Sequence, residues 1–141
     1  MSASSRFAVA VHILTLLAQN ESVALSSECI AGSVNTNPVV IRRVLGLLRR
    51  ACLVTSQPGL HGGWRLARSA STISLAAVYR ATESDAILSL HHRPPNPNCP
   101  VGRHIQDALT RIFRGAEAAL EQRLAPVTVA HVLGAVLEHS A

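Results

Sequence analysis

The chain of 141 residues contains no lysine and few aromatic side chains. All 13 basic residues are arginine, and aromatic residues make up 3% of the sequence. A core with so few rings must be built from aliphatic and alanine side chains, which suits packed helices. The charged fraction is 15% and the hydrophobic fraction is 48%, so the chain is too apolar to be intrinsically disordered.

Long apolar runs and cysteine pairs are also missing. No stretch is long enough to cross a membrane, and residues 1–20 lack a basic start followed by a cleavage site. We therefore expect a cytoplasmic protein without a membrane partner. The three cysteines, Cys29, Cys52 and Cys99, are widely spaced and provide neither a disulfide framework nor a CxxC metal pair. Because Cys29 and Cys52 have apolar neighbours, we expect both to lie in the core.

The residue combinations of an enzyme are absent from the sequence as well. It contains no phosphate-binding loop, no paired carboxylates and no nucleophile with a base at a recognisable spacing. We therefore expect no catalytic residues, no bound metal and no cofactor.

Positive charge is concentrated in the first part of the chain. Residues 1–82 hold eight arginines and two acids, whereas residues 83–141 hold five arginines and six acids. The formal net charge of +5 therefore originates in the first part. The phosphate backbone of a nucleic acid attracts a one-sided basic module of this kind, although a plain solvated surface can have the same charge.

Hydrophobic periodicity predicts a mainly helical fold. The first helix is expected over Phe7–Ala18, and a second, short helix is expected to begin at Ser26 or Ser27, either of which can serve as its cap. Further helices are expected from Ile73 and Ser74 through Ala81, over Val101–Leu124, and over about Thr128–Leu137. The segment Ser89–Pro100 contains four prolines, so we expect it to be a loop.

Between the short helix and the later ones, a third helix carries a band of arginines. Asn37 is a suitable N-cap, and Pro38 suits the first helical position. Apolar residues at helical spacing form a stripe for burial: Ile41, Val44, Leu45 and Leu48. Four arginines flank this stripe: Arg42, Arg43, Arg49 and Arg50. Gly46 costs about 1 kcal/mol relative to alanine in a helix, which indicates that a neighbouring helix crosses closely there.

A glycine-rich hairpin follows this helix directly. Leu53–Gln57 and Trp64–Ala67 are predicted to be short antiparallel strands, joined by a tip whose glycines permit a tight turn. Trp64 is expected to hold the hairpin against the core. This order of elements is that of a winged helix-turn-helix, in which the third helix enters the DNA major groove and the wing approaches the backbone or the minor groove.

Three stretches carry a resemblance to the Rrf2 family of bacterial winged-helix regulators. They are "SSRFAVAVHILTLLA" for the opening helix, "IRRVLGLLRRACLVTSQPGLHGGWRLAR" for the recognition helix and wing, and "STISLAAVYRATE" for the helix that follows. The wing motif G-x-x-G-G-aromatic-x-L is specific in this context. The resemblance implies a homodimeric transcription factor, expected to be a repressor, that binds double-stranded DNA at a palindromic operator.

Three positions depart from the family pattern. Pro58 stands where the family commonly has an arginine that enters the minor groove, so readout by the wing must come from His61 or the backbone, or be weaker. Cys52 replaces a glycine that often ends the recognition helix, which implies mild backbone strain. Members that carry an iron–sulfur cluster place three cysteines in the loop before the long helix, where this chain has only Cys99, so we expect a regulator without a cluster.

The expected organisation is mainly α with a small two-stranded antiparallel wing, followed by a long dimerisation helix. Residues 1–82 are expected to form the DNA-binding domain, and residues 83–141 the connecting loop and the dimerisation helices. The expected DNA contacts are Arg6, Asn37, Val39, Arg42, Arg43, Arg49, Arg50, His61, Gly62 and Arg65. The expected dimer contacts lie on the long helix: Ile105, Leu109, Ile112, Phe113 and Leu120.

Cys99 and His104 are the candidate sensor residues. They lie at the junction of the proline-rich loop with the long helix, near His91 and His92, and the start of a helix favours the reactive thiolate. A small-molecule or redox effector acting there could alter the spacing of the two recognition helices. Two alternatives to a plain regulator therefore remain: a redox- or metal-responsive regulator that uses Cys99, and a winged-helix module that binds protein instead of DNA.

Overall fold

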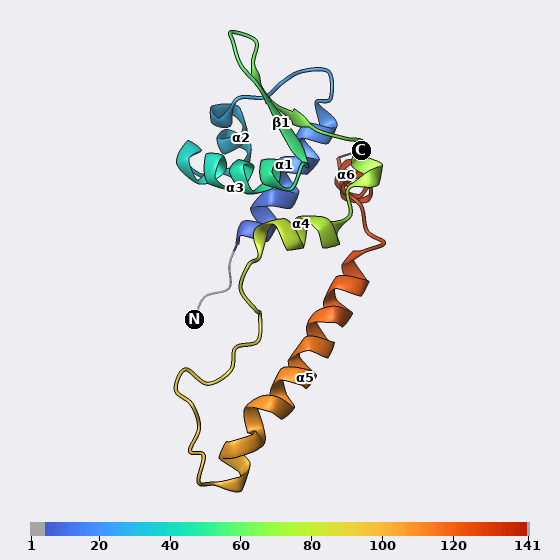
Figure 1. Ribbon diagram of the computed structural model, residues 1–141. Coiled ribbons are helices and arrows are strands. Elements are labelled where there is room, and N and C mark those ends of the chain that lie inside the picture. The colour runs from blue at the N-terminus through green and yellow to red at the C-terminus, as the bar shows by residue number, and fades with distance from the viewer. Residues whose placement is uncertain (1–4, 141) are drawn as a thin grey trace.

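Figure 1 shows the computed structural model of the protein, which describes residues 5–140. Two antiparallel strands and an otherwise helical chain confirm the expected fold class. The elements in chain order are α1 (Arg6–Gln19), α2 (Ser27–Val34), α3 (Pro38–Arg50), β1 (Val54–Gln57), β2 (Gly63–Leu66), a short 3₁₀ turn η1 (Ala70–Thr72), α4 (Leu75–Thr82), α5 (Pro100–Leu124) and α6 (Val129–Glu138).

The core is aliphatic and forms where α1 packs against α2, α3 and α4. Its largest fully buried side chains are all leucine, isoleucine or valine, among them Ile13, Leu14, Ile41, Leu45 and Leu48. The predicted stripe of α3 is therefore confirmed as its buried face. Trp64 is half-buried against this core, as expected, and its backbone pairs with Leu25 in the link after α1.

Short polar side chains define where the DNA-binding helices begin. The side chain of Ser26 accepts a hydrogen bond from the backbone N–H of Cys29 at the start of α2. Asn37 accepts one from Val40 at the start of α3, with Pro38 in the first turn. Both caps satisfy donors that have no partner inside the helix, so they set the register of the two helices.

The wing is a two-stranded hairpin whose tip depends on glycine. β1 and β2 pair in register from Val54 opposite Leu66 to Gln57 opposite Gly63. A Cβ at Gly62 would overlap the carbonyl oxygen of Gln57, so only glycine fits at that point of the tip. Cys52, just before β1, has a φ of 60°, which confirms the left-handed conformation expected at the end of the recognition helix.

Gly46 is not at a close helix crossing, so the sequence-based interpretation of this glycine is wrong. A Cβ built on Gly46 would meet no atom within 4 Å, because the residue lies on the outward side of α3 among the arginines. Packing inside the monomer therefore does not offset its low helix propensity.

We expect Gly46→Ala to raise the free energy of unfolding by about 0.5–1 kcal/mol, because alanine loses less backbone entropy in a helix. The midpoint of urea unfolding measures this change. Gly62→Ala is the contrasting variant, since its methyl group overlaps the Gln57 carbonyl and should lower the midpoint. A lower midpoint for Gly46→Ala would contradict the open surroundings of this residue.

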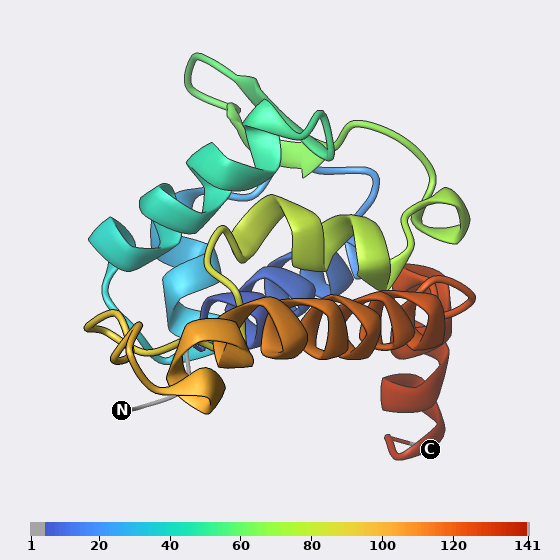
Figure 2. The same cartoon turned by 60° about the horizontal axis from the view of Figure 1, so that its bottom comes forward.

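The last two helices, α5 and α6, pack in different ways. The segment 83–99 leads away from α4, and α5 runs back beside it toward α6; α5 contacts α4 but has no fully buried residue (Figure 1). α6 instead packs back against α1 and supplies Val129 to the core. In Figure 2, the wing and α3 lie toward the top of the molecule, and α5 and α6 toward the bottom. The expected boundary at residue 82 stays a prediction.

Candidate nucleic-acid interface

The outward face of α3 is the most basic surface of the helix-turn-helix. Its four arginines, Arg42, Arg43, Arg49 and Arg50, are all exposed, and Val39 in the first turn is 55% exposed. The hydrophobic stripe on the opposite side of α3 is buried in the core, so this face cannot turn inward. The fold therefore presents the arginine band together with the N-terminal turn, where α3 begins at the Asn37 cap.

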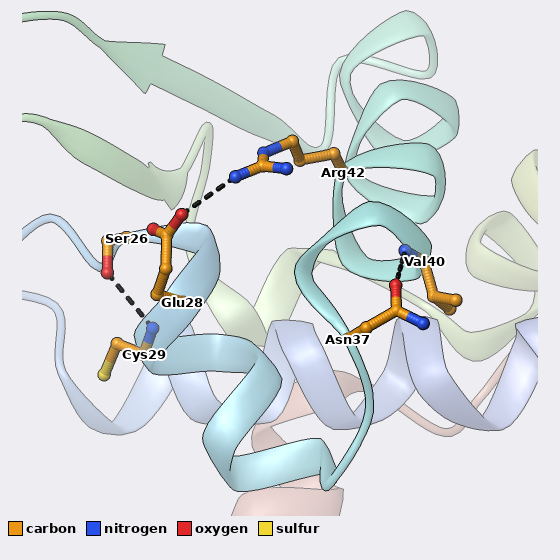
Figure 3. Close-up of polar contacts among 6 residues, drawn as sticks. All are labelled: Ser26, Glu28, Cys29, Asn37, Val40 and Arg42. Atoms are coloured by element: carbon orange, nitrogen blue, oxygen red, sulfur yellow. Dashed lines mark hydrogen bonds and ion pairs between the residues drawn. The ribbon is translucent and has the colours of Figure 1, made fainter.

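Arg42 is held by an acid on the preceding helix. Its Nη2 lies 2.8 Å from Oε1 of Glu28, which extends from the first turn of α2 (Figure 3). Both side chains are more than half exposed, so the pair contributes at most about 1 kcal/mol to stability. Glu28 nevertheless draws the guanidinium toward α2. Sequence reasoning missed this partner because only the tertiary fold brings residues 28 and 42 together.

Arg43 differs from Arg42 in its surroundings. Within residues 5–140 it has no ion-pair partner. Its exposed side chain leaves α3 at the next position after Arg42. Its charge is therefore the one in the first half of α3 that no acid neutralises. Arg49 and Arg50 lie in the last turn, where positive charge also stabilises the helix dipole. The Nε of Arg50 donates weakly to the carbonyl of Gly46 at 3.4 Å.

On the wing, the expected DNA contacts fall into two groups. His61 is exposed at the tip, next to Gly62. Arg65 is instead turned toward the body, where its Nη2 donates to the carbonyl of Ser22 at 2.8 Å. Arg65 thereby ties β2 to the turn after α1 and helps to fix the angle of the wing.

Arg6 lies apart from the arginines of α3. It is the first residue of α1, and its Nη2 lies 3.6 Å from Oε2 of Glu83, which follows α4. The structure therefore places this expected DNA contact in an ion pair within the fold. Its role toward DNA stays a prediction.

The expected dimer contacts lie along α5, which contacts α4 but has no fully buried residue. Ile112 is 63% exposed, while Ile105, Leu109, Phe113 and Leu120 are half-buried. A second apolar surface lies in an open groove between α1 and α6, lined by Phe7, Val11, Leu16, Val132, Leu133 and Val136 among others. A single copy of the chain leaves both surfaces in contact with water.

Within residues 5–140, no helix is both long and apolar enough to span a membrane.

Comparisons with known proteins agree with the helix-turn-helix geometry. A family model described as "Rrf2: Iron-dependent Transcriptional regulator" matches residues 3–135. YwnA of Bacillus subtilis (strain 168), named as an HTH-type transcriptional regulator, is 45% identical over 130 residues, which are 92% of this chain and 96% of YwnA.

Solved structures share the same architecture. One, described as a DNA-binding protein, has a TM-score of 0.74 and 43% sequence identity, and the match covers 92% of this chain and 99% of that one. T. potens IscR has a TM-score of 0.73 at 20% identity, and the match covers all of this chain and 92% of that one. At that identity the likeness to IscR concerns the fold alone.

An arginine-lined recognition helix followed by a glycine-tipped wing, in a chain with these relatives, defines a DNA-binding transcriptional regulator of the helix-turn-helix class. It is a regulator and not an enzyme. The chain belongs to the Rrf2 family.

The cysteines do not fit the iron site that the description of the family implies. Cys29 lies on α2, Cys52 follows α3, and Cys99 caps α5, so they belong to three separate elements. No group of three or more potential metal ligands gathers anywhere in residues 5–140. All three thiols are exposed, which corrects the expectation that Cys29 and Cys52 lie in the core. Ile30 and Leu53, which follow them in the sequence, are buried, whereas the two cysteines occupy outward positions.

We expect Cys99 to react fastest of the three thiols with a mild alkylating reagent. It occupies the N-cap of the 25-residue α5, at the positive end of the helix dipole, and its side chain caps no backbone group. Glu28 places a negative charge next to Cys29 in the sequence. Mass spectrometry of partly alkylated protein measures the three rates, with Cys99→Ser as the control. Faster modification of Cys29 or Cys52 would show that exposure alone sets reactivity.

Proposed function

We propose that the protein acts in the cytoplasm as a homodimeric repressor that binds a palindromic DNA operator and carries no iron–sulfur cluster. The observation that carries this proposal is the exposed arginine band of α3, presented by a fold whose long helix α5 buries none of its residues fully. A two-fold pair of such chains presents two recognition helices to two half-sites.

In this proposal the first turns of α3 lie in the major groove. Val39 and Arg43 reach base edges there, while Arg49 and Arg50 contact phosphates further along the groove. Glu28 keeps Arg42 directed toward α2 until a phosphate competes for its guanidinium. The wing, with His61 and Gly62, approaches the adjacent minor groove.

The apolar surfaces support a dimer formed through α5. The stripe from Ile105 to Leu120 is long, and a second copy can cover it by two-fold pairing of equivalent helices. Residues 83–99 connect α4 with the start of α5, so an effector or an oxidised thiol at Cys99 could change how the two DNA-binding parts are spaced. Response through Cys99 and His104 is the second candidate function, favoured by the exposure of both side chains.

Two binding experiments test the proposal. Duplexes selected from a random-sequence library by the wild-type protein should share an inverted repeat. Their affinity should fall steeply with salt, by a slope of about −0.9 in log–log units per phosphate neutralised. A winged helix that binds protein instead would select no common sequence and show no such slope.

Protein purified without air is expected to be colourless and to contain no stoichiometric iron or sulfide, because Cys99 is the only cysteine between α4 and α5. Iron and acid-labile sulfide assays measure this directly. A brown protein with near-stoichiometric iron would overturn the cluster-free assignment.

A further inference from the structure

The tip of the wing exposes a large apolar side chain. Leu60 is 93% exposed, the highest value among the large hydrophobic residues described as exposed. It occupies a turn closed by the hydrogen bond from the N–H of Gly62 to the carbonyl of Gly59. Figure 1 shows this hairpin projecting beyond all of the helices at the top of the molecule. An isoleucine or leucine in the core stabilises the fold, whereas Leu60 contributes no burial to it.

The strands that carry Leu60 at their tip are attached to the body of the protein. Leu25 and Trp64 exchange two backbone hydrogen bonds, of 2.8 and 3.0 Å, which pair β2 with the link after α1. Arg65 adds its bond to the Ser22 carbonyl. Gly63, at a φ of 143°, packs so closely on the backbone of Leu25 that no side chain fits between them. The position of the tip relative to α3 is therefore set before any partner binds.

Charge is scarce at this tip. Between Gln57 and Gly63 the only ionisable side chain is that of His61. The nearest arginine in the sequence, Arg65, donates back into the body of the protein. The tip thus lacks the fixed cations that hold a phosphate, although the wing follows a helix with four of them.

We infer that Leu60 is a wedge that enters the DNA minor groove next to the segment held by α3, and that it reads the deformability of the base steps there. Apolar side chains inserted into the minor groove unstack base steps and bend the duplex toward the major groove. Flexible pyrimidine–purine steps yield most easily to this distortion, so they are preferred without any hydrogen bond to a base. The inference rests on the proposed DNA binding and adds the means by which the wing selects sequence.

The test uses duplexes that the wild-type protein selects from a random-sequence library, and it compares three variants. Leu60→Ser removes the apolar surface and is expected to weaken binding roughly tenfold. It should also reduce the bend measured by energy transfer between dyes on the two duplex ends, while the salt slope stays the same. Leu60→Met keeps an apolar side chain and should retain both affinity and bend. Leu60→Arg should steepen the salt slope by about 0.9 for each phosphate it reaches.

Leu88→Ser is the matched control, because Leu88 is also an exposed leucine, at 40%, in the segment after α4. It should leave affinity and bend unchanged, and thermal unfolding should show all variants folded. If Leu60→Ser binds and bends the duplex as the wild type does, the inference that Leu60 acts as a wedge is wrong. The inference is also wrong if that variant loses only regulation in cells, since Leu60 would then contact a protein. In both cases, weaker binding of the selected duplexes by Arg43→Ala would still support the proposed DNA binding. Selection of no common sequence by the wild-type protein would overturn both.

Discussion

Replacing Arg42 and Arg43 together by alanine is expected to abolish sequence-specific binding while the protein remains folded. Both side chains are exposed on α3 and neither contributes to the buried stripe, so the fold loses little. The base contact proposed for Arg43 is worth about 1–3 kcal/mol, or roughly 5-fold to 150-fold in affinity, and the phosphate contact of Arg42 adds to it. Loss of a base contact relaxes specificity at one position, whereas loss of a phosphate contact weakens all sequences alike.

The two single variants should differ because their surroundings differ. Arg43→Ala removes a charge that no acid neutralises, whereas Arg42→Ala also leaves Glu28 unpaired on the same face. Part of the effect of Arg42→Ala is therefore repulsion between Glu28 and phosphate, and Glu28→Gln in the same chain should recover that part. Titration of selected duplexes at several salt concentrations measures these effects, with Arg123→Ala on α5 as a control of equal charge. Unchanged binding by the double variant would show that α3 does not lie in the groove.

A charged residue at Ile112 is expected to produce a monomer that no longer binds its operator. Ile112 is 63% exposed in the single chain, so Ile112→Glu costs the monomer little stability. In a dimer that covers this stripe, two glutamates would be brought together out of water, which disfavours association strongly. Without the partner, only one half-site can be bound at a time, and the gain from linking two binding events is lost.

Sedimentation at micromolar concentration measures the oligomeric state, and the same samples are used for DNA titration. Ile112→Leu is the matched control, since it retains apolar surface of similar volume and should remain dimeric. Phe113→Glu should act in the same direction, but Phe113 is half-buried, so its own unfolding must be measured beside it. A wild-type protein that sediments as a monomer would remove the basis for dimerisation through α5.

Local signals in the sequence determined much of the architecture. The caps Ser26 and Asn37, the proline in the first turn of α3 and the stripe from Ile41 to Leu48 predicted the helix-turn-helix, because each depends on neighbours within a few residues. The glycines of the tip predicted the wing for the same reason, since a left-handed or closely packed backbone excludes side chains. Three of the four strand ends shifted by one residue, because β1 begins at Val54 and β2 spans Gly63–Leu66.

Tertiary structure alone decided which side chains are engaged and which are available. Apolar neighbours suggested burial for Cys29 and Cys52, but the direction in which each side chain points depends on packing across elements, and both are exposed. Gly46 suggested a crossing helix, yet its side of α3 faces outward. The partners of Arg42 and Arg65 lie 14 and 43 residues away in the chain. Such contacts form only when the folded chain brings distant segments together, which periodicity within a short window cannot describe.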